Sequence, residues 1–505
     1  MLRRPHILCV WLGIVILAAY LRLNDLGQRP MHADEATGAR ILSQRIENNH
    51  YEFNPQHFHG PLLSLSSQAI SQIAGESSWQ TLSKQTLRMG PALTGILLVL
   101  TPLLWQRKIG APAALTTAAL LATSPLFVYY NRMYIHESLL LLLAMLTLPA
   151  VFKLVEKPHW RTATLTGLGM GLMFATKETF AISIVAWLIA TAVYLVVRQC
   201  QWIEPKNTSL PIKEYLISAL IISFVAAVSS SFFYSNGFRS FDGVVDAIRT
   251  YFIYETTAGH EKALNYYLHF LIWPKHLMGN WWSEGFIALL AIVSAAICIR
   301  CRAQRGVILY IVIATVAHFI IYSLISYKTP WLMLVPWAHA CLLAGLAARS
   351  FIGHKVATSI FTLILLLGLS YQTQQSLQAS GRLANDSRNP YAYVPTSNDM
   401  ESLQEWLKQL SPQTQTLEPI TVIGSDYWPL PWYLKNFASI GYWPEWDEAT
   451  MNAPLVFAMP AQMSAVELAL QETHVALPRS LRANVSITLF LRNDIWDQWT
   501  QTEHD

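Results

Sequence analysis

The sequence is poor in charge. Asp, Glu, Lys and Arg make up 13% of the 505 residues, while hydrophobic residues make up 53%. A chain of this composition is neither a disordered protein nor an ordinary soluble one. The net charge of +4 is small and comes mostly from short Lys and Arg clusters between apolar runs. It therefore indicates membrane topology rather than nucleic-acid binding, and we predict a polytopic membrane protein.

Cysteine is also scarce, with 5 residues that all lie in or beside apolar runs, so no disulfide framework is indicated. Cys298 and Cys301 form a single C-x-x-C without a second pair or a nearby histidine, and we interpret it as incidental. The N-terminal apolar run follows Arg3 and Arg4 but lacks a clear small-residue cleavage site. We therefore expect an uncleaved signal anchor.

Long apolar runs dominate the rest of the chain. A membrane crossing needs roughly 20 apolar residues. By that measure we predict about eleven transmembrane helices, near residues 7–23, 90–105, 111–130, 136–152, 162–176, 179–197, 214–233, 284–299, 307–326, 331–348 and 355–371. Two long runs are each split, one at Lys177 and Glu178 and the other at residues 327–330, where a proline cannot continue the preceding helix undisturbed.

Basic residues then orient the chain. If the N-terminus is cytoplasmic, every inner loop carries Lys or Arg, as the positive-inside rule requires. We therefore predict a multi-pass protein of the cytoplasmic (inner) membrane. The unusual polar residues then converge on the outer face, in the loop around Asp34, the turns at 131–136, 175–179 and 327–330, the loop 235–283 and the tail.

Two domains are predicted. Residues 1–371 form the transmembrane domain, with outer loops at 24–89 and 235–283; the first contains an amphipathic interfacial helix at 62–73, and the second has helix candidates at 241–254 and 263–276. Residues 372–505 form a small soluble extracytoplasmic α/β domain, with helices after Ser397 and at 465–473 and apolar runs at 420–423, 455–459 and 485–491. This domain has no Gly-rich phosphate loop or metal-ligand spacing. Its aromatic run YWPLPWY at 427–433 has no chemical interpretation from sequence alone.

The candidate site begins with Asp34 and Glu35, which follow the first span at the outer membrane surface. A neighbouring acidic pair is by itself more often a solvated loop, but here His57, His59 and Pro61 follow in the same loop.

The outer-face turns add Arg132, Lys177 and Lys328 at membrane depth or its edge. A charged side chain well inside the bilayer costs about 2.5–3.5 kcal/mol, so several on one leaflet indicate a protein-lined polar cavity. His136, Glu137 and Glu178, in the same turns, have the simpler interpretation of ion-paired or snorkelling residues.

Several segments resemble the GT-C superfamily of membrane glycosyltransferases, which includes protein O-mannosyltransferases, lipid A aminoarabinose transferases and the oligosaccharyltransferase catalytic subunit. They are HADEA after the first span, HGPL at 59–62, NRMYIHESLL at 131–140 and GLMFATKE at 171–178. More narrowly, YKTPW at 327–331, NPYAYV at 389–394 and YWPLPWYLKNF at 427–437 resemble a prokaryotic family identified as flippase-activity-associated. The fold class implied is a GT-C-like polytopic α-helical membrane protein with a small C-terminal α/β domain.

The resemblance implies an enzyme that transfers a hexosyl or pentosyl group from a polyprenyl-phosphate-linked donor to a lipid, glycan or protein acceptor. Inverting transfer needs a carboxylate to take the acceptor proton, and Asp34 is our choice of base. Glu35 could orient the acceptor or share a metal. Arg132, Lys177 and Lys328 would stabilise the phosphate leaving group.

A divalent metal is left open. His57 and His59 could join Asp34 or Glu35 as its ligands. Alternatively, His59 packs or hydrogen-bonds in the turn before Pro61.

The alternative function is a non-catalytic partner or transporter in lipid-linked glycan flipping, in which the same cavity binds a headgroup. Paired inverted repeats, or charged residues running through the membrane to both faces, would favour a transporter. The sequence has neither. A membrane-anchored sensor is a poor alternative, because one or two spans would suffice for anchoring.

Overall fold

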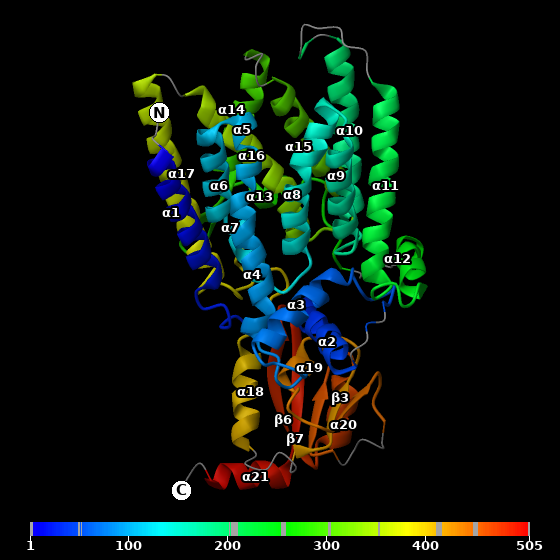
Figure 1. Ribbon diagram of the computed structural model, residues 1–505. Helices are drawn as coiled ribbons and strands as arrows, with labels where there is room; N and C mark the ends of the chain where they lie inside the picture. Colours follow the sequence, from blue (N-terminus) through cyan, green and yellow to red (C-terminus); the bar gives the residue numbers. More distant parts are fainter. Residues whose placement is uncertain are drawn as a thin grey trace. The chain divides into compact units, whose positions relative to one another are not determined.

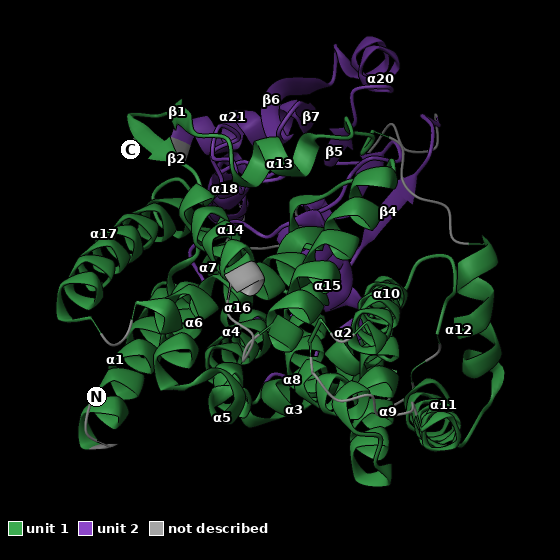
Figure 2. Cartoon of the chain, turned by 90° about the horizontal axis from the view of Figure 1, so that it is seen from above, with its two compact units in different colours: residues 1–26, 44–75, 85–384 green, residues 27–43, 76–84, 385–505 purple. Residues whose placement is uncertain are grey.

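The computed structural model describes residues 4–502 except 49–50, 52, 201, 204–210, 254–258, 301–304, 352–353, 411–416 and 448–452. The chain divides into two compact units (Figure 2). The first unit consists of Met1–Leu26, Gln44–Gly75 and Gln85–Ala384, and the second of Gly27–Ser43, Glu76–Lys84 and Asn385–Asp505. Two segments of the first outer loop thus group with the C-terminal residues, although the sequence placed the whole of 24–89 with the membrane domain. The predicted boundary at residue 371 stays a prediction.

The first unit is helical (Figure 1). Its elements are α1 (Arg4–Leu23), α3 (Leu62–Ile73), α4 (Lys84–Leu100), η1 (Thr101–Leu104), α5 (Gln106–Ile109), α6 (Ala111–Thr123), α7 (Pro125–Tyr130), α8 (Glu137–Glu156), α9 (Trp160–Phe174), α10 (Phe180–Gln199), α11 (Ile212–Tyr234), α12 (Asp242–Ile253), α13 (Tyr266–Leu271), the hairpin β1 (Lys275–Leu277) and β2 (Asn280–Trp282), α14 (Gly285–Arg300), α15 (Arg305–Leu324), η3 (Pro330–Met333), α16 (Leu334–Ser350) and α17 (Lys355–Ser380). The predicted interfacial helix is confirmed as α3.

Helices occupy all eleven ranges that the sequence predicted as spans. Within the described residues, 8 helical segments are long and apolar enough to cross a membrane, and α6 and the described part of α14 are shorter apolar helices. The chain is therefore a multi-pass membrane protein, while the count of eleven crossings stays a prediction.

Helix α16 forms the core of the first unit. It packs against α6, α8, α14 and α15, and the most apolar window of Pro330–Ser350 is 100% buried. Gly345 permits the close approach of α6, because a Cβ there would lie 2.0 Å from the Thr117 hydroxyl and 2.7 Å from the Ala113 carbonyl oxygen. Small residues at such contacts are typical of membrane helix packing. By contrast, only 11% of the corresponding window of α11 is buried, so α11 exposes its apolar surface.

The second unit contains a mixed five-stranded sheet. Its elements are the start of α2 (Ala33–Asn48), α18 (Asp399–Leu410), β3 (Ile420–Ile423), α19 (Leu430–Tyr433), β4 (Ile440–Trp443), β5 (Leu455–Ala458), α20 (Met463–Leu470), β6 (His474–Arg482), β7 (Val485–Arg492) and α21 (Asn493–Thr502). The strand order is β4-β3-β5-β7-β6; β3 is parallel to β4 and β5, and β7 is antiparallel to β5 and β6. The buried core includes Val456, Phe490 and, from α20, Val466.

The predicted α/β tail is confirmed, since β3, β5, β7, α18 and α20 coincide with the predicted runs. The sequence missed β4 and β6, which are the two edge strands of the sheet. Strand β4 is partly exposed and contains Gly441, and β6 contains Pro478. Such residues weaken a strand signal but are tolerated at an edge.

Among the described cysteines, Cys9, Cys200 and Cys341 are free. The interpretation of Cys298 and Cys301 as an incidental pair lies outside the described side chains.

Candidate active site

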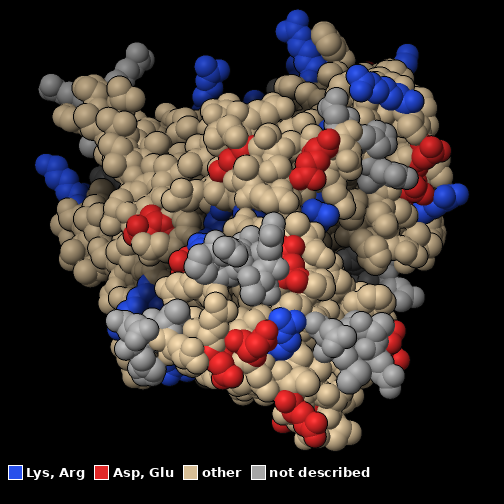
Figure 3. Space-filling model, turned by 90° about the horizontal axis from the view of Figure 1, so that it is seen from below, with Lys and Arg blue, Asp and Glu red and all other residues tan. Residues whose placement is uncertain are grey.

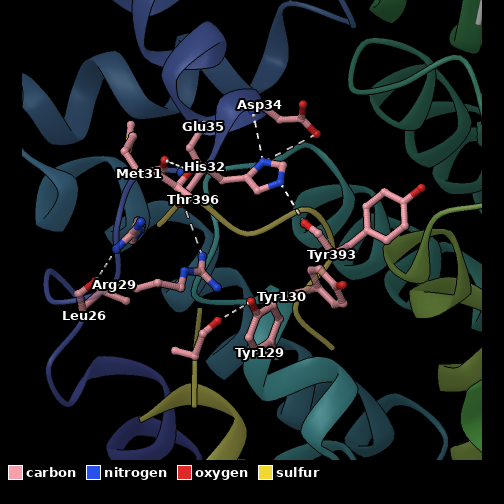
Figure 4. Close-up of polar contacts among 12 residues, drawn as sticks. Leu26, Arg29, Met31, His32, Asp34, Glu35, Tyr129, Tyr130, Tyr393 and Thr396 are labelled. Carbon is pink, nitrogen blue, oxygen red and sulfur yellow. Dashed lines mark hydrogen bonds and ion pairs between the residues drawn. The ribbon is translucent and has the colours of Figure 1, made fainter. Parts of the chain in front are cut away.

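The acidic pair that follows the first span lies in the first turn of α2. His32 caps this helix: its Nδ1 accepts a hydrogen bond from the Asp34 backbone N–H (3.1 Å), while Glu35 Oε2 accepts one from the His32 backbone N–H (3.1 Å). This arrangement resembles a capping box, with a histidine in place of the usual Ser or Thr and with the N2 backbone N–H of Asp34, rather than that of N3, as the donor to the cap. Because Nδ1 is an acceptor, Nε2 carries the proton and donates to the Tyr393 carbonyl oxygen at 3.1 Å (Figure 4).

The cap separates the roles of the two carboxylates. The Glu35 side chain is fully buried, and its Oε2 lies 3.6 Å from a guanidinium nitrogen of Arg29. The Asp34 side chain is 53% exposed, and its Oδ2 lies 3.9 Å from His32 Nδ1. Glu35 is therefore held in the fold, whereas Asp34 presents a carboxylate that a substrate can reach.

In the first unit, the HGPL turn packs against the turn at 175–179. The Leu62 backbone N–H donates to the Ala175 carbonyl oxygen at 2.9 Å. A Cβ on Gly60 would lie 2.2 Å from that same oxygen, so only glycine permits this approach. Two segments that the sequence singled out separately thus form one substructure.

One ion pair lies within this substructure and another connects it to the start of α8. His59 Nδ1 lies 3.0 Å from Glu178 Oε2 within it, and Lys177 Nζ donates to Glu137 Oε1 of α8. The His59 and His136 rings meet edge to face with centroids 5.0 Å apart. The interpretation of Glu137 and Glu178 as ion-paired residues agrees with these contacts.

Mutual charge keeps this cluster ionised despite its burial. Burial alone would raise the pKa of Glu178, but His59 and Lys177 outweigh it and lower the pKa to about 2. Burial would likewise lower the pKa of Lys177, but the Glu137 and Glu178 carboxylates raise it above its usual range. Burial, with His59 and Lys177 nearby, holds the pKa of His136 well below its ordinary value, so His136 is neutral at pH 7.

The YKTPW turn lies beside this cluster, since the Tyr327 side chain is close enough to Lys177 to influence its pKa. The next residue, Lys328, is buried, and its Nζ donates to the Lys262 carbonyl oxygen (3.1 Å) and to that of Ile325. Carbonyl oxygens hold this cation without neutralising its charge.

Arg132 also donates to carbonyl oxygens. Its guanidinium lies 3.1 Å from the Leu21 carbonyl oxygen, in the last turn of α1, and 3.2 Å from that of Asp25, just after the helix. A neighbouring arginine that the sequence analysis did not single out, Arg22, is fully buried and donates to Asn131 Oδ1 at 3.1 Å. In the sequence Arg22 stands at the end of an apolar run, where basic residues commonly flank a transmembrane helix, so the pattern did not distinguish it.

His57 and the metal have less support. His57 is exposed, and no side-chain hydrogen bond or ion pair joins it to His59 within the described residues. The described residues also contain no group of three or more His, Cys, Asp or Glu side chains that could hold a metal ion. The metal therefore stays an untested prediction.

An apolar groove of about 440 Å³ runs along α9, α10 and α11. Its lining includes Phe174, Phe180, Ile184, Ala219 and Ile222. Phe174 and Phe180 stack with centroids 4.9 Å apart, directly before and after the turn that carries Lys177. The groove lining therefore includes the residues on either side of the turn 175–179, although Lys177 itself is not part of it.

The seven predicted site residues fall in both units. Asp34 and Glu35 lie in the second unit, and His57, His59, Arg132, Lys177 and Lys328 lie in the first. Within the first unit the structure brings together the turns that carry His59, Lys177 and Lys328.

Comparison with known proteins supports a common fold. Residues 58–230, about a third of the chain, match the family model described as dolichyl-phosphate-mannose-protein mannosyltransferase. A search of curated protein sequences found no significant match. Solved structures, by contrast, match along almost the entire chain.

Three of these solved structures illustrate the similarity in fold. ArnT from Cupriavidus metallidurans, bound to undecaprenyl phosphate, is 14% identical with a TM-score of 0.60, covering 96% of this chain and 98% of its own. The oligosaccharyltransferase AglB from Archaeoglobus fulgidus, in complex with an inhibitory peptide and a dolichol-phosphate, is 13% identical with a TM-score of 0.54, covering 97% and 76%. The arabinofuranosyltransferase AftD from Mycobacteria is 12% identical with a TM-score of 0.50, covering 97% and 40%.

The chain therefore shares the fold of ArnT and AglB, and the GT-C-like fold class predicted from its motifs is confirmed. The narrower likeness to the flippase-activity-associated family stays a prediction.

Proposed function

We propose that the protein is a glycosyltransferase that moves a sugar from a polyprenyl-phosphate-linked donor to an acceptor at the outer face of the cytoplasmic membrane. Transfer inverts the anomeric centre, and Asp34 is the general base. The transferred group is a hexose or a pentose, and the acceptor is a lipid, a glycan or a protein. The relatives named above support the donor class, since ArnT and AglB were solved with polyprenyl phosphates.

The observation that carries this proposal is the apolar groove whose lining includes Phe174 and Phe180, the residues on either side of the turn that carries Lys177. A polyprenyl phosphate needs apolar surface for its chain and a cation for its headgroup, side by side. Phe174 and Phe180 of the groove directly flank the segment that holds Lys177. An apolar groove without a neighbouring cation would suit any lipid tail and would not favour a phosphate.

The chemistry assigns a role to each group. Asp34 takes the proton of an acceptor hydroxyl as the hydroxyl oxygen attacks the anomeric carbon. The bond between that carbon and the phosphate oxygen breaks, and its electron pair leaves with the phosphate. Arg132, Lys177 and Lys328 stabilise the growing negative charge. These cations are buried, so their charges act through a medium that screens them less than water does.

Two of the three remaining predicted residues, His59 and Glu35, have supporting roles. His59, paired with Glu178, fixes the loop that packs against the Lys177 turn. Glu35 fixes the first turn of α2, so that Asp34 is presented at the helix N-terminus.

The test is a transfer assay with the full-length protein in nanodiscs, a panel of radiolabelled polyprenyl-phosphate sugars, and membrane extract as acceptor. We expect Asp34→Asn to lose at least about 100-fold in transfer rate, the scale of general-base catalysis, with unchanged thermal stability because the side chain is 53% exposed. Asp34→Glu, which keeps a carboxylate, should retain more activity than Asp34→Asn.

Normal transfer by Asp34→Asn would overturn the assignment of the base. Donor binding without transfer by the native protein, with several acceptor extracts, would favour the alternative of a non-catalytic partner or transporter in glycan flipping.

A second experiment tests the donor groove. Ala219→Trp fills the groove, and we expect it to reduce photo-crosslinking of a polyprenyl-phosphate probe by about tenfold, since it displaces the lipid chain. Leu220→Trp on the same helix is the matched control, because Leu220 is 72% exposed and is not part of the groove lining. Equal crosslinking of both variants would remove the groove from the proposal.

A further inference from the structure

The second unit contains a pocket of about 310 Å³ that the proposed function does not use. Its volume is at the lower end of the range of roughly 300–1,000 Å³ that is common for small-ligand sites. Residues from distant parts of the chain line it, among them Arg40, Trp79, Tyr427, Trp428, Lys435 and Tyr442. It includes part of the aromatic run YWPLPWY.

Aromatic rings form much of the lining. The rings of Tyr427 and Tyr442 lie with centroids 4.8 Å apart at 38°, and Trp428 lies 6.2 Å from Tyr427. Tyr442 is 38% exposed. Because side chains alternate along a strand, Ile440 and Tyr442 of β4 share the face that lines the pocket, while Trp443 points to the other face.

Two cations complete the pocket. The Arg40 guanidinium carbon lies 5.4 Å from the centre of the Trp79 ring, and Lys435 Nζ lies 3.9 Å from the centre of the Trp432 ring. Lys435 Nζ also donates to the Leu82 carbonyl oxygen, and the Glu76 carboxylate is near enough to influence its pKa. Burial lowers the pKa of Lys435 to about 8. A bound anion would raise this pKa again, because it favours the charged form of the lysine.

Helix α2 links this pocket to the proposed base. Arg40 follows Asp34 by six residues on the same helix, within the part of α2 that belongs to the second unit. At 1.5 Å per residue the two Cα positions are separated by about 9 Å along the helix axis. Six residues also correspond to a rotation of about 600°, so a ligand held at Arg40 must pass about a third of the way around the helix to reach Asp34.

From these contacts we infer that the pocket is an acceptor subsite that binds an acidic saccharide, with ring faces against the sugar and Arg40 and Lys435 against its carboxylate. This inference rests on the proposed function. A sugar ring has apolar C–H faces, which carry a partial positive charge and suit the negative faces of aromatic rings. Its carboxylate suits the planar fork of an arginine.

The combination of groups favours this ligand over simpler ones. A free phosphate would need the cations but would gain nothing from the aromatic lining. An acyl chain would use the rings but would cover the Arg40 and Lys435 side chains without supplying a negative charge or a hydrogen-bond acceptor, which is costly.

The test measures binding without turnover. Full-length protein in nanodiscs is titrated with tetragalacturonate, with neutral maltotetraose of equal length and with inorganic phosphate, and saturation-transfer difference NMR follows the sugar protons. We expect the acidic tetrasaccharide to bind at least about tenfold more tightly than the neutral one, because charge-assisted hydrogen bonds add to ring stacking. Phosphate should fail to displace it at equal concentration.

Matched variants locate the site. Arg40→Gln and Tyr442→Ala should each weaken tetragalacturonate binding by about tenfold. Arg388→Gln, an exposed arginine of the same unit, and Trp443→Ala, on the opposite face of β4, should leave binding unchanged. Equal binding of the acidic and neutral sugars, displacement by phosphate, or no effect of Arg40→Gln and Tyr442→Ala would each overturn the inference.

The result is separable from that of the transfer assay. If Asp34→Asn abolishes transfer but tetragalacturonate does not bind, the pocket inference fails and the proposed function stands. If tetragalacturonate binds through Arg40 and Tyr442 while no donor supports transfer, the pocket is a saccharide site and the enzyme proposal fails.

Discussion

At the scale of single residues, the charges of the first unit are mutually dependent. Glu178 is ionised inside the protein because His59 and Lys177 lie beside it, and Lys177 is protonated because Glu137 and Glu178 lie beside it. Removing one member leaves a buried charge without its partner, which is costly. Protonation of one member at low pH therefore weakens the interactions of the others.

The pH dependence of stability follows from Glu178. Its pKa of about 2 in the folded protein is below the ordinary value of 4.5, so its stabilising contribution is complete above about pH 4.5 and is lost as the pH falls toward 2. We expect the native protein to exceed Glu178→Gln in melting temperature at pH 6, and the difference to shrink between pH 4.5 and 3. Glu405→Gln, an exposed surface variant, should show no such difference at any pH.

Sequence alone could not divide the roles of Asp34 and Glu35. Both follow the first span and both are carboxylates, so the pattern predicted a pair. The helix cap decides between them, because position N3 of a capping box turns Glu35 back to the His32 N–H and leaves Asp34 outward.

At the scale of elements, the HGPL turn depends on the absence of a side chain at Gly60. The loop is held by the hydrogen bond from Leu62 to Ala175 and by the ion pair of His59 with Glu178. The two turns therefore move together, and a change at Gly60 should reach Lys177.

We expect Gly60→Ala to lower both thermal stability and transfer rate. Its Cβ would lie 2.2 Å from the Ala175 carbonyl oxygen, so one of the turns must shift. Overpacking of this kind costs about 1–3 kcal/mol. Gly13→Ala in α1 is the control, because nothing lies within 4 Å of a Cβ there. Stability and activity like those of the native protein would show that the two turns tolerate displacement.

The elements also show where pattern-based prediction succeeds. Helix α3 and strand β3 have the predicted bounds, because their apolar periodicity reports burial directly. The start of α2 was missed as a helix, since ADEATGARILSQRIEN carries many polar residues and a glycine. Its cap depends on a histidine and on Tyr393, which lies far along the chain.

At the scale of the whole molecule, uncharged side chains cover most of the face seen in Figure 3, and acidic and basic side chains form small separate groups. This agrees with a chain in which 13% of the residues are charged. The predicted orientation rests on loop charge alone, with the N-terminus cytoplasmic and residues 372–505 outside.

Cysteine labelling of intact cells tests that orientation in a background without native cysteines. We expect Ser425→Cys in the second unit to react with a membrane-impermeant maleimide without permeabilisation. Lys157→Cys, in a predicted inner loop, should react only after permeabilisation. Both positions are exposed, so access to the reagent depends on the side of the membrane. The reverse labelling pattern would invert the topology and place the proposed site in the cytoplasm.

The sequence by itself determined the class of the molecule, its helical spans, most strands of its C-terminal sheet and the identity of the motif turns. These follow from local composition and periodicity, because burial in lipid or in a sheet demands apolar residues at regular positions. Only the tertiary structure decided which carboxylate is exposed, which cations are paired, and that Arg40, Trp79 and Tyr442 line one pocket. Contacts between residues so distant along the chain arise from packing, and no local pattern encodes them.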